Sequence, residues 1–294
     1  MYKYARHIRR KIAGHTDRHK WEHEAPDDII EEFNVTYSGR DGNDLYADIY
    51  RPKECRGEKL PVIVLLHGGG LFLGKPIMER DVCELLAGKG YLVFAPSYRM
   101  MDEADAPGEI SDICAALDFA ADALEERGGD PDRAFMIAES AGAFLGLYAA
   151  ASARSPELSN ILGCRSSRLD LKALAFVSGM FYTTKKNFIG LLYPKAIFRE
   201  LRKDKTFMSY MDPENSRVIS CLPPAILTSS RADPLKKASK QYYRALKAAG
   251  NKCRFLYYGQ KNKELTHAFV NLRPYLPESR DALDKICEWF EASV

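Results

Sequence analysis

The feature that most constrains the fold of this chain is a regular alternation of short apolar segments with helical patterns. Most of the apolar segments hold few polar residues, which is typical of strands covered by helices on both faces of a parallel sheet. The alternation predicts an α/β fold with a doubly wound sheet. Eight strands are expected, at 33–38, 45–50, 61–67, 91–98, 133–140, 171–179, 224–230 and 253–258, the first two forming an antiparallel edge. Helical patterns cover 78–88, 107–127, 141–154, 234–249 and 278–292.

Two segments lie outside this alternation. Residues 1–32 precede the first expected strand, and we treat them as an N-terminal arm of an α/β domain that spans residues 33–294. Residues 182–222 separate two expected strands by more than a crossover connection requires, and they are rich in aromatic and basic residues. Both segments are candidate cap elements over a site at the strand ends. The alternative is decoration of the outer surface.

Charge and cysteine content exclude several classes of protein. The 294 residues include 43 Lys and Arg against 40 Asp and Glu, a balance that argues against a nucleic-acid partner. The basic residues at the N-terminus interrupt every apolar run there, so we expect no signal peptide, and no stretch is apolar enough to cross a membrane. The 7 cysteines are an odd number without a CxxC pair, which indicates reduced thiols and a cytoplasmic location.

The arm itself leaves two alternatives open. Three of its histidines repeat at four-residue spacing and would share one helix face, where they could bind a metal. No carboxylate or cysteine completes a ligand set at that spacing, so we expect a solvated or cap-packed arm and no metal. Binding to an anionic membrane is disfavoured because the apolar stripe of the arm is narrow. The three histidines are His15, His19 and His23.

Ser140 lies between an expected strand and an expected helix, within the sequence Ala138-Glu139-Ser140-Ala141-Gly142. A serine on such a sharp turn projects its hydroxyl above the sheet, and small residues two positions before and after it let strand and helix backbones approach each other. Ala138 and Gly142 occupy these two positions. The ordinary alternative is a serine that caps the helix N-terminus. The pattern favours a nucleophile elbow.

The segment His67-Gly68-Gly69-Gly70 directly follows another expected strand. Consecutive glycines permit a tight loop whose backbone N–H groups point inward, as an acyl-transfer enzyme requires to stabilise an oxyanion. The alternative is a plain turn at the end of a strand, although a turn seldom needs three glycines. We interpret the segment as an oxyanion loop.

A general base and an orienting acid complete the expected site. Four of the 6 histidines lie in the arm and one precedes the glycines, which leaves His267. Asp233 follows the strand expected at 224–230, at the sheet edge where open α/β folds place their sites. It also suits the N-terminus of the next helix, and both roles are compatible. The order Ser140, Asp233, His267 is that of the α/β hydrolases.

With these residues in place, the chain resembles the hormone-sensitive lipase-like carboxylesterases of the α/β-hydrolase superfamily. The resemblance covers most of residues 40–292, and it implies an α/β-hydrolase fold with a helical cap. It also implies that the N–H groups of Gly69, Gly70 and Ala141 form the oxyanion hole. The chain departs from the family pattern at Ala138, usually glycine, and at 100–103. The matching segments are HGGG at 67–70, GGDPDRAFMIAESAG at 128–142, DPL at 233–235 and HAF at 267–269.

We therefore expect a carboxylesterase that hydrolyses small-molecule esters without a cofactor. Leu71 and Phe72, directly after the glycines, are expected to wall the acyl side of the site, so that short acyl chains are preferred. Two enzymatic alternatives are a deacetylase of acetylated sugars and a serine peptidase on the same fold. A different class is a ligand-binding relative without catalysis, because a fold alone does not imply an activity. The sequence does not indicate an oligomeric state.

Overall fold

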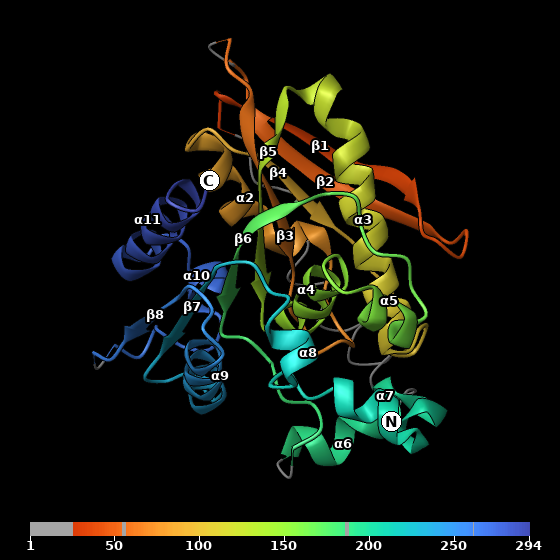
Figure 1. Ribbon diagram of the computed structural model, residues 1–294. Helices are drawn as coiled ribbons and strands as arrows, with labels where there is room; N and C mark the ends of the chain where they lie inside the picture. The colour runs from red at the N-terminus through yellow and green to blue at the C-terminus, as the bar shows by residue number, and fades with distance from the viewer. Residues whose placement is uncertain (1–25, 55–56, 186–187, 261) are drawn as a thin grey trace.

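The computed structural model describes residues 26–54, 57–185, 188–260 and 262–294. Eight strands form one sheet in the order β1-β2-β4-β3-β5-β6-β7-β8 (Figure 1). β1 and β2 are antiparallel, β2 is antiparallel to β4, and all remaining pairs are parallel. The predicted sheet and its antiparallel edge are confirmed. The strands are β1 Ile29–Ser38, β2 Asp44–Pro52, β3 Leu60–Leu66, β4 Leu92–Pro96, β5 Gly129–Glu139, β6 Leu171–Val177, β7 Ala225–Ser230 and β8 Cys253–Tyr258.

Helices cover both faces of the sheet, because side chains along each parallel strand point alternately to the two faces. On β3, Val62 and Val64 belong to the core shared with α3 Ala106–Arg127 and α4 Ala141–Ser152. Ile63 and Leu65 belong to the core on the opposite face. That second face is covered by α2 Arg80–Gly88, α10 Phe269–Leu272 and α11 Pro277–Glu291, while α5 Pro156–Leu162 and α9 Lys236–Ala248 lie on the first. A short 3-10 helix, η1 Pro76–Glu79, precedes α2.

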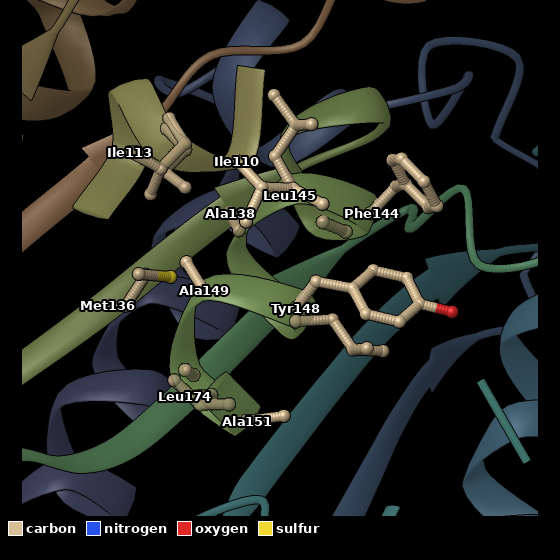
Figure 2. Packing of buried hydrophobic residues seen from close by; sticks show 14 of the residues in the cluster. Ile110, Ile113, Met136, Ala138, Phe144, Leu145, Tyr148, Ala149, Ala151 and Leu174 are labelled. Atoms are coloured by element: carbon tan, nitrogen blue, oxygen red, sulfur yellow. The ribbon is translucent and has the colours of Figure 1, made fainter. Parts of the chain in front are cut away.

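α4, the helix that follows Ser140, is buried along its whole length. All its residues are buried, and its side chains pack between the sheet and α3 (Figure 2). Small residues allow the close approach: a Cβ added at Gly146 would lie 2.7 Å from Met136 Sδ on β5. A helix fixed on every side holds its N-terminal end in one position. That end carries the predicted nucleophile.

The first strand begins at Ile29 rather than at residue 33, so the domain boundary expected after residue 32 falls inside β1. The sequence hid this start because Glu31 and Glu32 interrupt its apolar pattern. The structure pairs Glu31 with Arg80 of α2 and Glu32 with Arg127 of α3. The short helices α5 and α10 were also not predicted, since helices of this length leave almost no periodic signal.

Within 182–222, residues 188–219 form a layer of short helices on the side of α4 (Figure 1). Phe198 is fully buried, and its ring packs against Phe144 of α4 with the ring centroids 6.3 Å apart. Tyr193 donates a hydrogen bond of 3.0 Å to the carbonyl oxygen of Gly70, in the predicted oxyanion loop. These contacts bring the layer, the segment expected to form a cap, against α4 and against the loop that follows β3. Its helices are α6 Phe188–Ile197, η2 Arg199–Lys203, α7 Lys205–Tyr210 and α8 Ser216–Ile219.

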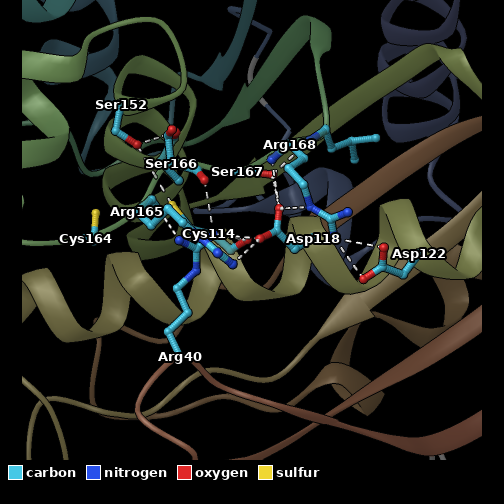
Figure 3. Close-up of polar contacts among 12 residues, drawn as sticks. Arg40, Cys114, Asp118, Asp122, Ser152, Cys164, Arg165, Ser166, Ser167 and Arg168 are labelled. Atoms are coloured by element: carbon cyan, nitrogen blue, oxygen red, sulfur yellow. Dashed lines mark hydrogen bonds and ion pairs between the residues drawn. The ribbon is translucent and has the colours of Figure 1, made fainter.

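Asp118 of α3 joins two loops to the helix (Figure 3). Its carboxylate pairs with Arg40, from the β1–β2 loop, at 2.8 Å. It also accepts a 2.8 Å hydrogen bond from the N–H of Arg168, in the loop before β6. The residue is 7% exposed, so removing its carboxylate would leave partly buried partners unsatisfied. None of the helices in the described ranges is long and apolar enough to cross a bilayer.

Candidate active site

Ser140 lies between the last residue of β5 and the first residue of α4, with φ 49° and ψ −110°. A non-glycine residue in such a conformation costs roughly 1–3 kcal/mol and persists only where its surroundings fix it. The N–H of Ser140 donates to the carbonyl of Val177 at 2.9 Å, and its carbonyl accepts from the N–H of Met180 at 2.8 Å. The end of β6 and the residues after it therefore hold the backbone on both sides of the turn.

The Ser140 side chain forms no hydrogen bond to the helix N-terminus. Its Oγ instead lies 2.8 Å from Nε2 of His267. The helix-capping alternative for this serine is therefore wrong, because the hydroxyl is directed to an imidazole. Ser140 and His267 are 127 residues apart in sequence, and the fold brings them into hydrogen-bond contact.

Asp233 completes the line of contacts. Its Oδ1 lies 2.8 Å from His267 Nδ1 and also accepts the N–H of Leu235 at 2.8 Å, while its Oδ2 accepts the Ser229 hydroxyl at 2.7 Å. Burial raises the pKa of Asp233, but hydrogen bonds from His267, Ser229 and Leu235 outweigh this and hold the pKa below its usual value. The carboxylate is thus ionised at neutral pH and accepts the Nδ1 proton. The next helix begins at Lys236 with Leu235 at its N-cap, later than the start expected at Pro234, and Asp233 binds the N–H of that N-cap residue from two positions before it.

The backbone beside His267 is held by a serine that the sequence analysis missed. Ala268 has φ 54°, and its N–H donates to Ser178 Oγ at 3.0 Å. Ser178 itself directly follows β6 and is fully buried. The sequence could have indicated Ser178 because it directly follows β6, the strand next to β5, which ends directly before Ser140. Ser229 was also missed, because it lies within the apolar pattern of β7 and has no feature that distinguishes it from other strand residues.

The glycine loop after β3 has positive φ at two glycines, 109° at Gly69 and 66° at Gly70, a region that glycine adopts without strain. A Cβ at Gly69 would lie 2.2 Å from the carbonyl oxygen of Leu73, so the turn leaves no space for a side chain. His67 anchors the loop: its ring stacks on Tyr98 with centroids 4.2 Å apart, and the Tyr98 hydroxyl donates to the His67 carbonyl at 2.8 Å. Burial lowers the pKa of His67 to about 4, so its ring is neutral at pH 7.

The loop lies directly against the nucleophile elbow. A Cβ at Gly68 would be 3.1 Å from Ser140 Cβ, and one at Gly142 would be 2.6 Å from the His67 carbonyl oxygen. Leu71 has no accessible surface and packs in the core, where its carbonyl accepts the N–H of Met101 at 2.8 Å. Of the two residues expected to wall the acyl side, only Phe72 keeps exposed surface.

Replacement of Gly142 by alanine is expected to destabilise the protein by about 1–3 kcal/mol and to lower activity, because the added methyl group would push the elbow helix away from the His67 carbonyl. Thermal denaturation and esterase assays of the purified variant measure both effects. Gly88→Ala is the matched control: a Cβ there would meet no atom within 4 Å. Equal melting temperatures for the two variants would contradict the expectation.

No cluster of three or more metal-ligating side chains occurs within the residues that the structure describes. His15, His19 and His23, weighed above as an alternative metal site, lie outside those residues. Around Ser140, the groups brought together are a hydroxyl, an imidazole, a buried carboxylate and a glycine loop at the end of a neighbouring strand. Such a set can activate a hydroxyl for attack on a carbonyl carbon.

Comparisons with known proteins agree with this chemistry. A family model described as the α/β hydrolase fold matches residues 63–271. Carboxylesterase NlhH of Mycobacterium tuberculosis is 27% identical over 267 residues, which cover 87% of this chain and 80% of NlhH. Carboxylic ester hydrolase LipN of the same species is 30% identical over 247 residues, covering 78% of this chain and 62% of LipN. Esterase B from Lactobacillus rhamnosis has the same fold, with a TM-score of 0.85 at 22% identity over 99% of this chain and 94% of that one.

The family match extends over most of the chain and includes every predicted site residue, from the glycine loop to His267. The relatives named as carboxylesterases align with most of this chain, well beyond a single motif. This chain belongs to the α/β-hydrolase family and is a carboxylesterase of the hormone-sensitive lipase-like group.

Proposed function

We propose that this carboxylesterase acts through a Ser140-His267-Asp233 triad and an acyl-enzyme intermediate. The observation that carries the proposal is the unbroken pair of 2.8 Å contacts, Ser140 Oγ to His267 Nε2 and His267 Nδ1 to Asp233 Oδ1. Because Asp233 accepts the Nδ1 proton, Nε2 is free to accept the proton of the serine hydroxyl. A ligand-binding relative without catalysis would not need this arrangement.

In the proposed reaction, Ser140 Oγ attacks the ester carbonyl carbon while its proton moves to His267 Nε2. The tetrahedral intermediate collapses, the carbon–oxygen bond to the alcohol breaks, and the alcohol leaves with the proton from His267. A water molecule then attacks the acyl-enzyme, giving its proton to His267. Collapse of the second intermediate releases the carboxylic acid and returns the proton to Ser140.

The oxyanion of both intermediates would be bound by the N–H groups of Gly69, Gly70 and Ala141. The close approach of the glycine loop to the elbow supports this assignment, as does the position of Ala141 at the start of a helix. Helix N-termini present unpaired N–H groups and a positive dipole end to a developing negative charge. Donors fixed in this way need no reorganisation when charge develops on the substrate oxygen.

A fluorophosphonate probe is expected to label the protein at Ser140, since among the residues that the structure describes only this serine has both an imidazole partner and the proposed oxyanion donors. The probe phosphorus bonds to Ser140 Oγ and fluoride leaves. Peptide mass spectrometry of the labelled protein locates the adduct. An adduct at another serine, or none after prolonged incubation, would contradict the mechanism.

We expect short acyl chains to be preferred because the cap is packed closely on the site. Tyr193 contacts the glycine loop, Phe198 is buried against α4, and Phe72 keeps only part of its surface exposed. The acetyl to butyryl esters of p-nitrophenol are expected to be hydrolysed with at least about tenfold higher kcat/KM than the decanoyl ester. A maximum at ten carbons or more would mean that the cap does not limit acyl length. Acetylated sugars and peptide substrates in the same assays test the two alternative substrate classes.

A further inference from the structure

Two carboxyl groups lie buried beside the nucleophile, and the mechanism above uses neither. Glu139 precedes Ser140 and is 5% exposed, while Glu79, the last residue of η1, is 2% exposed. Buried acidic side chains are rare unless other groups bind them. Their partners therefore indicate what these two residues do.

Glu139 is bound to the glycine loop. Its carboxyl group accepts a hydrogen bond from the backbone N–H of Gly68. The contact is close enough that a Cβ at Gly68 would lie 2.4 Å from Glu139 Oε1. Glycine is needed at position 68 because the Glu139 carboxyl group occupies the space that a side chain would fill. The φ of Gly68 does not itself require glycine. The glycine loop and the elbow are joined at this point.

The second carboxyl group extends the contact to the segment that carries the base. Glu79 is hydrogen-bonded to Glu139, and its Oε2 accepts the Asn271 side-chain amide at 2.6 Å. Asn271 belongs to α10, which begins two residues after His267, and it is 3% exposed. One continuous series of hydrogen bonds therefore runs from the loop through the elbow and η1 to α10.

Two carboxyl groups can hydrogen-bond to each other only when at least one of them is protonated. Burial, followed by the neighbouring Glu79, raises the pKa of Glu139 well above its usual value, while the Gly68 N–H opposes the rise. A single shared proton satisfies both groups without a buried repulsion. The pair then carries one negative charge in place of two and forms a fixed connection.

We propose that Glu139 is a positioning residue of ester hydrolysis: through Gly68 it holds the oxyanion loop against the elbow, and through Glu79 and Asn271 it ties both to the His267 segment. This inference rests on the proposed function, because it assumes that the N–H groups of the loop bind the oxyanion. Glu139 does not touch the reacting atoms. It acts by keeping the donors at the distance that the intermediate requires, where an error of about 1 Å costs about a hundredfold in rate.

The test compares two variants of Glu139. In Glu139→Gln the amide oxygen accepts the Gly68 N–H and the amide nitrogen donates to Glu79, so kcat is expected to stay within about threefold of wild type. In Glu139→Ala both contacts are lost, and kcat is expected to fall at least about thirtyfold with KM within about threefold. The concentration of active enzyme is measured by titration to completion with a fluorophosphonate.

An inhibitor that forms an oxyanion separates positioning from general structural damage. A trifluoromethyl ketone forms a hemiketal with the serine, and its inhibition constant is expected to rise in Glu139→Ala by about the factor by which kcat falls. Asp48→Ala is the matched control, since Asp48 is a buried carboxylate of β2 that accepts the Asn34 N–H at 2.9 Å. It is expected to lower the melting temperature and leave kcat and the inhibition constant unchanged.

Wild-type kcat in Glu139→Ala, or an equal loss in Glu139→Gln and Glu139→Ala, would overturn the inference. If Glu139→Ala does not fold, Asn271→Ala replaces it: a several-fold lower kcat at constant KM supports the inference, and an unchanged kcat overturns it. Ser140→Ala is assayed alongside. An active Ser140→Ala would disprove the proposed function itself, whereas an inactive Ser140→Ala with a fully active Glu139→Ala would disprove the positioning role alone.

Discussion

Ser140→Ala is expected to lower kcat for p-nitrophenyl butyrate by at least about 10⁴-fold, equivalent to roughly 5.5 kcal/mol in the activation free energy. The variant keeps the glycine loop and His267 but loses the atom that bonds to the acyl group. Catalysis would then depend on direct attack by a water molecule, which no group of the site is known to position. KM is expected to change little, because the hydroxyl contributes to the reaction and not to binding of the ester. Steady-state kinetics with homogeneous enzyme measure both constants.

His267→Ala is expected to lower kcat by a similar factor, and the double variant should be little worse than either single variant. Groups that act in one step are not additive, since a serine without its base and a base without its serine are both idle. Ser152→Ala is the matched serine control. Ser152 is also buried, and its Oγ donates a 2.9 Å hydrogen bond to the Ala149 carbonyl and lies 3.9 Å from Cys114 Sγ of α3, away from His267. A multiplicative loss in the double variant would mean that Ser140 and His267 act independently.

The candidate site was predictable from the sequence where a residue type and a position at a strand end coincide. Ser140, Asp233 and His267 each follow a strand whose apolar run is readable, and the parallel sheet brings those ends to one edge. The eight strands were predicted for the same reason. Burial on both faces removes polar residues from a strand and makes it visible in the sequence.

Residues that act through backbone atoms were not predictable in this way. Ser178 holds the backbone beside His267, and Glu139 holds the N–H of Gly68. The pairing in each case depends on which backbone group the fold brings near, and neither side chain belongs to a periodic pattern. Leu71 shows that a position next to a recognisable motif can also mislead. Its place after the glycines predicted an acyl wall, but a φ of 65° turns its side chain into the core.

The start of β1 was not predicted because it contains charged residues that are paired only in the folded structure. Glu31 and Glu32 lie in β1, and only their arginine partners from α2 and α3 make the strand compatible with these acids. The cap was recognisable as an excess of residues between two strands. Its four short helices were not, because their packing on α4 depends on aromatic contacts between distant parts of the chain.

Asp233→Asn is expected to lower kcat by about 10²–10³-fold, a loss smaller than that of Ser140→Ala. The hydrogen-bond partners of Asp233 explain the difference. Its Oδ1 accepts both the Leu235 N–H and the His267 Nδ1 proton, whereas Oδ2 meets only the Ser229 hydroxyl, which can rotate to act as acceptor. An asparagine would therefore place its oxygen at the Oδ1 position and its NH₂ group toward Ser229. The imidazole keeps the tautomer that accepts the serine proton.

What the asparagine cannot supply is the negative charge that stabilises the imidazolium formed in the transition state. A variant in which the amide faced His267 with its NH₂ group would also lose the tautomer, and the loss would then approach about 10⁴-fold. The measured kcat thus distinguishes the two amide orientations. Asp118→Asn is the matched control: Asp118 is a buried carboxylate on α3 that binds Arg40, so the change should lower stability without changing kcat. Activity of Asp233→Asn within tenfold of wild type would mean that another group orients His267.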